Sequence, residues 1–246
     1  MRKPAAVVLA AGLGKRMNSD LPKVLHKFAG STIIEFVLDT VEGLSPERVV
    51  LVIGHRAEML RSALATRKVD FALQAEQLGT GHAVMQCEDA LGSFEGTIIV
   101  LVGDVPLLRT ETLAALLETH RRTGAACTVL TAKFSDPKGY GRVMRGSDGH
   151  VEGIVEDKDA TPTQLAIQEI NTGILAFESG LLWQHIHKLR RGNAQAEYYL
   201  TDLVGLLRAE GYTVAAHCAE DPWEVKGVNS VEQLAELERI FLKRVG

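Results

Sequence analysis

The residues Ala6-Val-Val-Leu-Ala-Ala-Gly-Leu-Gly-Lys-Arg-Met17 run from a short apolar stretch into a loop with two glycines, and Leu21-Pro-Lys23 follows. Glycine has no Cβ, so backbone N–H groups in such a loop can approach phosphate oxygens closely. Arg16 and Lys23 add positive charge that can neutralise phosphate groups. Met17 stands where a dinucleotide-binding fingerprint has its third glycine, and the chain has no Gly-x-x-x-x-Gly-Lys-Ser/Thr loop. Dinucleotide redox chemistry and P-loop hydrolysis therefore both lose support.

Apolar stretches with the length of buried strands alternate with helical patterns in the first half of the chain. Strands are expected at Ala6–Ala10, Arg48–Ile53, Val69–Leu73 and Thr97–Val102, and helices near 31–42, 55–65, 80–90 and 110–122. This alternation predicts an α/β fold with a Rossmann-like, doubly wound and mostly parallel sheet. Ligands of such sheets bind beyond the carboxyl ends of the strands, so the residues that follow each strand are the candidates for a site.

The second half is richer in β-like patterns. We expect a hairpin from Arg142–Arg145 and Val151–Glu156, a strand at Gln168–Phe177, helices near 179–190 and 196–210, and a strand at Tyr212–His217. These pieces are expected to form a β-rich extension over the ligand edge, around 135–210, within a main domain that spans 1–229. A C-terminal helix is expected at 230–246, because Ser230-Val-Glu-Gln233 fits a capping box and apolar residues recur at helical spacing after it.

The composition is that of a compact globular protein, with 46% hydrophobic and 24% charged residues among 246, and a formal net charge of −4. This charge argues against a broad nucleic-acid or anionic-membrane surface, but not against a nucleotide, which needs only a few placed cations. Cys87, Cys127 and Cys218 form no Cys-x-x-Cys pair and are expected to be free thiols. No apolar run approaches the ~18 residues of a membrane span. We expect a cytoplasmic protein.

A series of motifs resembles the sugar-phosphate nucleotidyltransferase superfamily. More narrowly, it is similar to the N-terminal uridylyltransferase domain of bifunctional bacterial N-acetylglucosamine-1-phosphate uridylyltransferase/glucosamine-1-phosphate acetyltransferases. Besides the glycine loop, the matching segments are 20–26, 74–83, 103–107, 139–143, 154–160, 169–174, 197–202 and 224–229. The resemblance implies a Mg²⁺-dependent reaction in which N-acetylglucosamine 1-phosphate attacks the α-phosphate of UTP in line. The products would be pyrophosphate and UDP-N-acetylglucosamine, a precursor for cell-wall aminosugars.

The resemblance also implies roles for individual residues. Arg16 and Lys23 are the expected catalytic cations, and Asp104 and Asn229 the expected Mg²⁺ ligands. The residues implied to bind the nucleotide are Leu9, Ala10, Ala11, Gly12, Gly14, Gln74, Gly79, Thr80, Gly103 and Asp104. Those implied to bind the sugar and its neighbouring groups are Gly141, Glu156, Asn171, Thr201 and Asn229. The residue types suit these roles, because an amide offers the uracil edge both a donor and an acceptor, and Mg²⁺ prefers oxygen ligands.

Simpler explanations exist for several of these residues. Asp104 is compatible with a helix N-cap or a turn residue, Thr201 with a helix N-cap, Glu156 with a solvated hairpin tip, and Asn171 with a turn cap. His82 is expected to support the Gly-Thr-Gly turn rather than to catalyse. Two other functions stay open: a nucleotidyltransferase for another base or for another sugar or alditol phosphate, and a non-catalytic nucleotide-sugar-binding protein.

Two departures from the family pattern remain. Val102 precedes Gly103-Asp104, where an aromatic residue is expected in many relatives. The sequence also lacks the hexapeptide repeats of the left-handed β-helix that carries acetyl transfer and trimerisation in the bifunctional proteins. We therefore expect no β-helix domain and no acetyl transfer from acetyl-CoA. The expected state is a monomer or weak dimer whose C-terminal helix packs onto the α/β domain.

Overall fold

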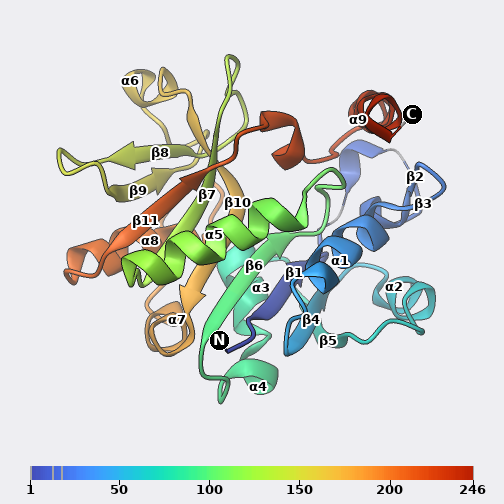
Figure 1. Cartoon of the computed structure of the whole chain (residues 1–246), viewed down its shortest axis with the longest axis horizontal. Helices are drawn as coiled ribbons and strands as arrows, with labels where there is room; N and C mark the ends of the chain where they lie inside the picture. Colours follow the sequence, from blue (N-terminus) through green and yellow to red (C-terminus); the bar gives the residue numbers. More distant parts are fainter. Residues whose placement is uncertain (1, 13, 18, 246) are drawn as a thin grey trace.

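The structure is a computed structural model that describes residues 2–12, 14–17 and 19–245, and Leu13 of the glycine loop lies outside these ranges. The described residues form a nine-stranded sheet in which the main path has the order β11–β7–β10–β6–β1–β4–β5 (Figure 1). Its parallel half consists of β1 (Ala5–Leu9), β4 (Arg48–Ile53), β5 (Asp70–Leu73) and β6 (Thr97–Val102). The four strands predicted in this half are thus confirmed, and their carboxyl ends share one edge.

The other half of the sheet is mixed. It contains β7 (Cys127–Lys133), β10 (Glu169–Glu178) and β11 (Val214–Cys218). β10 runs antiparallel to both β6 and β7, whereas β11 is parallel to β7. The hairpin of β8 (Arg142–Arg145) and β9 (Val151–Val155) was predicted, and it pairs with β10 beside the main path.

Two pieces expected in the extension, β10 and β11, are instead strands of the main sheet, because β10 inserts between β6 and β7. The strand β7 was not predicted. The division into 1–229 and 230–246 stays a prediction, whereas the mostly parallel α/β fold is confirmed.

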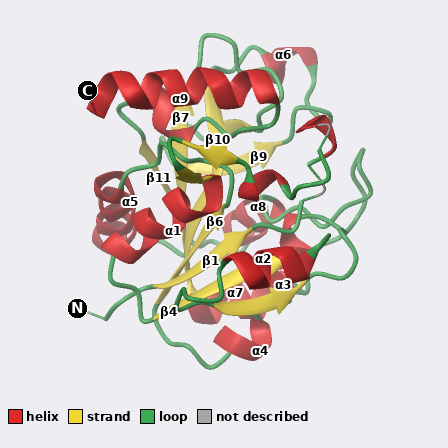
Figure 2. Ribbon diagram, turned by 90° about the vertical axis from the view of Figure 1, so that its right-hand side faces the viewer, coloured by secondary structure: helices red, strands yellow, loops and turns green. Residues whose placement is uncertain are grey.

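Helices cover both faces of the sheet (Figure 2). One face packs against α1 (Ile33–Gly43), α2 (Ala57–Ala63) and α5 (Thr110–Thr123). The opposite face packs against α3 (Thr80–Met85), α4 (Glu88–Leu91), α7 (Ser179–Ile186) and α8 (Asp202–Ala209). The helix expected near 80–90 is therefore two short helices, and the one expected near 196–210 begins later, at Asp202.

The remaining elements connect this framework. They are the hairpin of β2 (Lys27–Phe28) and β3 (Ser31–Thr32), the short helix α6 (Pro162–Leu165), 3-10 turns at Lys15–Met17, Lys23–Leu25 and Pro222–Val225, and the helix α9 (Val231–Val245). No helix of the described residues combines the length and apolar character needed to cross a bilayer. In the described part of the chain no strands form a left-handed β-helix.

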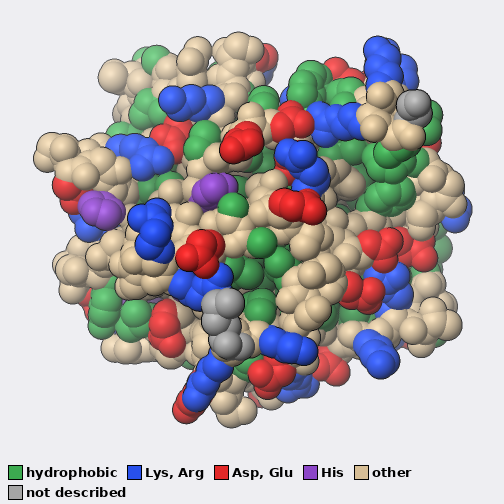
Figure 3. Space-filling view, in the orientation of Figure 1, with side chains coloured by type: hydrophobic (Ala, Val, Ile, Leu, Met, Phe, Trp, Pro, Cys, Tyr) green, Lys and Arg blue, Asp and Glu red, His purple; other side chains and the backbone are tan. Residues whose placement is uncertain are grey.

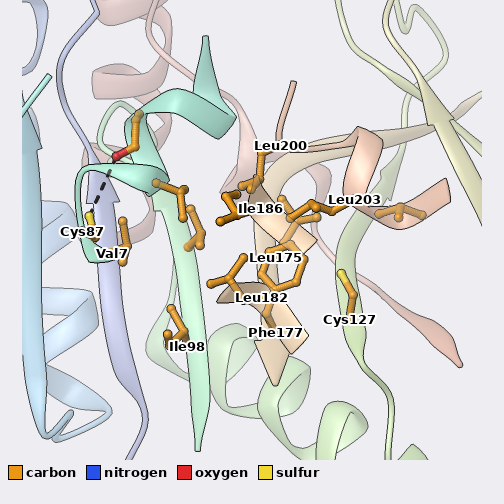
Figure 4. Packing of buried hydrophobic residues seen from close by; sticks show 14 of the residues in the cluster. Val7, Cys87, Ile98, Cys127, Leu175, Phe177, Leu182, Ile186, Leu200 and Leu203 are labelled. Carbon is orange, nitrogen blue, oxygen red and sulfur yellow. Dashed lines mark hydrogen bonds between the residues drawn. The ribbon is translucent and has the colours of Figure 1, made fainter. Parts of the chain in front are cut away.

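The strands divide their side chains between two apolar layers, as alternation along a strand requires. In β1, Val7 belongs to the layer beneath α3, α4, α7 and α8, whereas Ala6 and Val8 belong to the layer beneath α1, α2 and α5. Figure 4 shows the first layer, where Phe177 of β10 and Leu182 of α7 lie next to each other, between Ile98 of β6 and Cys127 of β7. Burial of each large aliphatic side chain contributes ~1.5–3 kcal/mol. The two layers hold the carboxyl edge of the sheet as a fixed platform.

Candidate active site

Two adjoining cavities lie at the carboxyl edge of the sheet. The first, here the β1 cavity, has a volume of ≈ 200 Å³ and is lined by Leu9, Ala10, Ala11, Gly12, Lys23, Val24, Gln74, Gln77, Gly79, Thr80, Ala83, Val102 and Asp104. The second, the β10 cavity, has a volume of ≈ 220 Å³ and is lined by Leu9, Thr80, Val102, Gly139, Tyr140, Gly141, Glu156, Asn171, Thr172, Gly173, Leu175, Leu200 and Thr201. Leu9, Thr80 and Val102 belong to both linings, so the cavities share a wall.

The glycine loop leaves β1 and folds back against the segment that carries Lys23. Gly14 has a φ of +59°, and a Cβ there would lie 2.9 Å from the Cβ of Lys23. A larger residue at position 14 would therefore push the two segments apart. Gly103 is packed similarly, since its N–H donates to the Leu9 carbonyl at 2.9 Å and its own Cβ would lie 3.0 Å from that oxygen. Neither glycine lines a cavity, but both bring cavity-lining residues close together.

Four of the predicted residues converge beside the β1 cavity, although they come from three distant parts of the chain. The Lys23 ammonium donates to the Asp104 carboxylate and, at 3.2 Å, to the Asn229 Oδ1. The Arg16 guanidinium donates to the same Asn229 oxygen at 2.9 Å. The side chains of Lys23 and Asp104 are only 16% and 17% exposed, whereas Arg16 is exposed. Two cations thus face a carboxylate and an amide oxygen at the mouth of the cavity.

The oxygens of Asp104 and Asn229 fit a Mg²⁺ site of the open kind. Both side chains offer hard oxygen donors, and both contact the same ammonium, so they point to a common position. Gly227 lies against the carboxylate, where a Cβ would come within 3.3 Å of both Asp104 oxygens. No group of three or more His, Cys, Asp or Glu side chains in the described residues has metal-binding geometry. Two protein ligands are nevertheless typical of Mg²⁺ that also binds phosphates and waters.

Asp104 and Thr201 do not serve as helix caps through their side chains. The N-cap of α5 is Arg109, five residues beyond Asp104. Thr201 stands at the N-cap position of α8 but makes no side-chain capping bond there. Its hydroxyl donates instead to the Glu156 carboxylate at 2.9 Å. The helix-cap explanation is therefore not supported for either residue, whereas Asp104 does lie in a turn, as its other simple explanation requires.

The amide of Gln74 is held in one orientation in the wall of the β1 cavity. Gln74 is 4% exposed, and its Nε2 donates to the Gly79 carbonyl at 3.0 Å. The same nitrogen lies 3.2 Å from His82 Nδ1, whose ring stacks on Tyr198. A carbonyl only accepts, so the nitrogen end of the amide must face Gly79. The oxygen end is left as an acceptor for a ligand, and His82 supports Gln74 as well as the turn.

The turn at Gly79–Thr80, in the wall of the β1 cavity, contacts residues 198–200, of which Leu200 lines the β10 cavity. Gly79 has a φ of +106°, and a Cβ would lie 2.6 Å from the Tyr198 carbonyl oxygen. Gly81 N–H donates to that carbonyl at 2.8 Å, and the Thr80 hydroxyl accepts the Leu200 N–H at 3.0 Å. The wall between the cavities is therefore built from both segments.

The β10 cavity collects the predicted sugar-binding residues. Gly141 N-terminal to β8 accepts the Asn171 N–H through its carbonyl at 2.8 Å, which brings these two residues side by side. Asn171 Oδ1 accepts the Gly173 N–H at 3.1 Å, as a turn cap would, and the residue also lines the cavity. The Glu156 carboxylate, which accepts the Thr201 hydroxyl, lies against Gly141, where a Cβ would come within 3.3 Å of its Oε2. Carboxylate, amide and hydroxyl groups thus converge on a space of sugar size.

Burial changes the acidity of two groups around the β10 cavity. It raises the pKa of the Glu156 carboxyl, and nearby Asp202, Asp159 and Asp157 raise it further, while the Thr201 hydroxyl opposes them. Burial also raises the pKa of the Tyr140 phenol, with a smaller contribution from Asp104. Glu156 therefore holds a proton to a higher pH than an exposed glutamate does.

Several lining residues were not predicted, among them Gln77, Gly139, Tyr140 and Leu200. Tyr140 directly precedes the predicted residue Gly141 in the Gly139–Val143 motif, and an aromatic residue within that motif was the available signal. Arg16 and Asn229 line neither cavity. Asn229 is joined to the lining residue Lys23 of the β1 cavity by a hydrogen bond, and Arg16 is joined to Asn229.

A larger cavity of ≈ 820 Å³ lies at the opposite edge, around the first residues of β4 and β5. Four of its charged groups form ion pairs within the lining, Arg48 with Asp70 at 2.6 Å and Arg67 with Glu42 at 3.3 Å. On the face drawn in Figure 3, Lys and Arg side chains are interspersed with Asp and Glu. At the carboxyl edge, cationic, carboxylate, amide and hydroxyl groups converge on two adjoining cavities. This edge is therefore the stronger candidate for an active site.

Comparisons with known proteins agree with this placement. The MobA-like NTP transferase domain family matches residues 6–169. Curated relatives named "Bifunctional protein GlmU" are 47% identical over 242 residues in Geobacter metallireducens and 46% identical over 245 residues in Enterococcus faecalis. These alignments cover 98% and 100% of this chain but 51% and 53% of the relatives, so the chain spans about half the length of the curated relatives it matches.

A solved structure gives the fold independently. A UDP-glucose pyrophosphorylase complexed with UDP-glucose superposes with a TM-score of 0.78, covering 99% of this chain and 100% of that one, at 16% identity. At this identity the likeness concerns the fold alone. Together with the family match over the glycine loop, Asp104 and the β8–β9 hairpin, it confirms the nucleotidyltransferase resemblance. The chain belongs to the MobA-like NTP transferase domain family.

Proposed function

We propose that this chain is a uridylyltransferase that joins UTP to N-acetylglucosamine 1-phosphate, giving UDP-N-acetylglucosamine and pyrophosphate. The observation that carries the proposal is the convergence of Arg16, Lys23, Asp104 and Asn229 at the rim of the β1 cavity, next to a second cavity of sugar size. A binding protein needs the cavities. It does not need two cations, a carboxylate and an amide gathered where the phosphates of both ligands would meet.

The reaction requires alignment and charge neutralisation more than covalent participation. The phosphate oxygen of the sugar phosphate is already an anionic nucleophile, and the leaving pyrophosphate gains negative charge in the transition state. Lys23 and Arg16 stand where they can neutralise that charge and hold the phosphates in line. Mg²⁺ held by Asp104 and Asn229 would supply further charge to the phosphate oxygens. Lys23 would then move from the carboxylate to the phosphates when substrate binds.

The two cavities supply the recognition of the organic groups. In the β1 cavity, the free oxygen of Gln74 suits the N3–H donor of uracil, whereas the corresponding cytosine nitrogen is an acceptor. In the β10 cavity, Glu156, Asn171 and Thr201 offer hydrogen bonds to the hydroxyl and acetamido groups of an aminosugar. The chain is 46–49% identical to relatives named "Bifunctional protein GlmU". This identity supports UTP and N-acetylglucosamine 1-phosphate as the substrates. A cytoplasmic location and a monomeric or weakly dimeric state stay predictions.

Pyrophosphate release tests the proposal directly. Four NTPs are each combined with N-acetylglucosamine 1-phosphate, glucose 1-phosphate or an alditol phosphate, with Mg²⁺ and with EDTA. We expect stoichiometric pyrophosphate from UTP and N-acetylglucosamine 1-phosphate, and loss of turnover with EDTA. A preference for another pair would replace the substrates and keep the reaction class. No turnover with any pair, together with tight binding of UDP-N-acetylglucosamine, would identify a non-catalytic binding protein.

A further inference from the structure

One small apolar cluster lies beneath three of the four convergent residues. Its buried members are Met17, Phe28, Ile33, Leu107, Val228 and Leu237. Met17 directly follows Arg16, Leu107 lies three residues after Asp104, and Val228 directly precedes Asn229. The cluster is separate from the two large layers of the sheet. The backbone next to Arg16 and Asn229, and close to Asp104, therefore carries side chains of one apolar cluster.

The helix α9 closes this cluster. Leu237 is 1% exposed, and Phe241 packs against Phe28 and Phe36 with ring centroids 5.6 and 5.3 Å apart. Figure 1 shows α9 lying beside the β2–β3 hairpin, which follows the Lys23 segment. The outer side of the helix is exposed, with Leu242 at 54%. One face of α9 thus contacts the framework of the site and the other does not.

Two hydrogen bonds join side chains of α9 to backbone N–H groups, one in the turn of the β2–β3 hairpin and one at Asn229. The Glu238 carboxylate accepts the Ala29 N–H at 2.7 Å, where Ala29 has a φ of +45° that non-glycine residues rarely adopt. The Gln233 side-chain oxygen accepts the Asn229 N–H at 2.8 Å. The predicted capping box is thus modified: Ser230 Oγ accepts the Gln233 N–H at 3.3 Å, and Gln233 reaches Asn229 instead of Ser230.

We propose that α9 is a positioning element for the reaction, with Leu237 and Glu238 as its positioning residues. The helix sets the separation between the cation pair Arg16 and Lys23 and the oxygen pair Asp104 and Asn229, and its residues line neither cavity. This inference rests on the proposed function. Loosening α9 weakens the alignment of the triphosphate, whereas Glu156 and the rest of the β10 cavity keep their contacts. Besides a lower kcat, we therefore expect a higher KM for UTP and an unchanged KM for the sugar phosphate.

A matched pair of leucine substitutions tests the apolar contact. Leu237→Ala removes a buried side chain, and Leu242→Ala makes the same change on the exposed side of the same helix. A displacement of about 1 Å at a distance from the reacting atoms can lower turnover ~10²-fold. We expect Leu237→Ala to lower kcat at least ~10-fold and to raise the KM for UTP, with an unchanged KM for the sugar phosphate, and Leu242→Ala to match the wild type. A KM for the sugar phosphate raised as much as that for UTP, or wild-type kinetics in folded Leu237→Ala, would overturn the proposal.

The Glu238 bond gives a second test that does not depend on Leu237→Ala folding. Glu238→Gln keeps an oxygen acceptor for the Ala29 N–H, whereas Glu238→Ala removes it. We expect the alanine variant to lose UTP efficiency and the glutamine variant to recover most of it. Hydrogen exchange at the Ala29 amide in the free protein should accelerate in Glu238→Ala alone. This readout needs no substrate, so it tests the bond between Glu238 and Ala29 separately from the proposed reaction. Unchanged exchange would contradict the positioning role of this bond even in an active enzyme.

Discussion

Replacement of Lys23 by methionine keeps most of the side-chain length and removes the charge. In the free protein this ammonium pairs with the Asp104 carboxylate and donates to Asn229, and both charged side chains are about one-sixth exposed. The substitution has two opposite consequences. The phosphates lose a preorganised cation in the transition state, and Asp104 loses the counter-ion that competes with a metal.

The magnitude of the first consequence follows from what one preorganised contact to a developing charge contributes, ~2.7–4 kcal/mol, or ~10²–10³ in kcat. The second consequence raises the affinity of the free protein for a divalent ion, because Lys23 no longer repels it. Leaving the Asp104 carboxylate without its cation costs ~1–3 kcal/mol of stability. For a chain of this size that corresponds to a Tm lower by ~2–4 °C per kcal/mol.

Pyrophosphate release and Mn²⁺ binding, measured on the same preparations well below the Tm, report both consequences. The control is Lys27→Met, which removes an exposed lysine from β2, four residues further along. We expect Lys23→Met to turn over ~10²-fold slower while binding Mn²⁺ more tightly, and Lys27→Met to match the wild type. Wild-type turnover in folded Lys23→Met would remove this residue from the mechanism. Weaker Mn²⁺ binding would show that Asp104 and Lys23 do not compete.

Four further substitutions probe the metal ligands, the sugar cavity and the wall between the cavities. Asp104→Asn should raise the Mg²⁺ concentration for half-maximal turnover, since one formal charge is lost, and Asn229→Ala should do so more mildly; a wild-type Mg²⁺ titration in both would place the metal elsewhere. Glu156→Gln should raise the KM for the sugar phosphate. Burial raises the pKa of this carboxyl, so its contribution to stability is present below about pH 4 and is lost as the pH rises through the raised value. The glutamine variant should therefore have the higher Tm at neutral pH, and an advantage that is larger at acid pH would contradict this. Gly79→Ala combines a φ of +106° with a Cβ only 2.6 Å from the Tyr198 carbonyl oxygen; it should lower the Tm and both substrate affinities, and unchanged thermal unfolding would show that the turn adapts.

The parallel half of the fold could be predicted because its signals are local. Continuous apolar runs such as Arg48–Ile53 and Thr97–Val102 have the pattern of strands buried on both faces, and they are strands with these bounds. The position of β10 could not be predicted in this way. Its own pattern is that of a strand, but its place between β6 and β7 depends on pairings with residues about 40 to 80 positions away. The same separation hid β7, which carries no ligand motif to draw attention to it.

The site shows the same division between local and distant information. The motifs indicated Lys23, Asp104 and Asn229, and the structure brings them together. Their roles stay predictions until they are tested. The bond from Arg16 to Asn229 joins residues 213 positions apart, and no spacing rule reports such a contact. The Glu156–Thr201 bond was equally hidden, because each residue alone has a common structural explanation.

The insertion of β10 between β6 and β7 also has a consequence during synthesis on the ribosome. β6 pairs with β1 on one side, and its other edge acquires a partner only when residues 175–178 have emerged. Until then the edge of the apolar strand β6 is unpaired in the nascent chain. β7 has been made but does not pair with β6 directly, because β10 lies between them in the sheet. Open edges of this kind recruit other chains. A ribosome that pauses before residues 175–178 have emerged would therefore expose this edge of β6 to misassembly, and a pause after they have emerged would not.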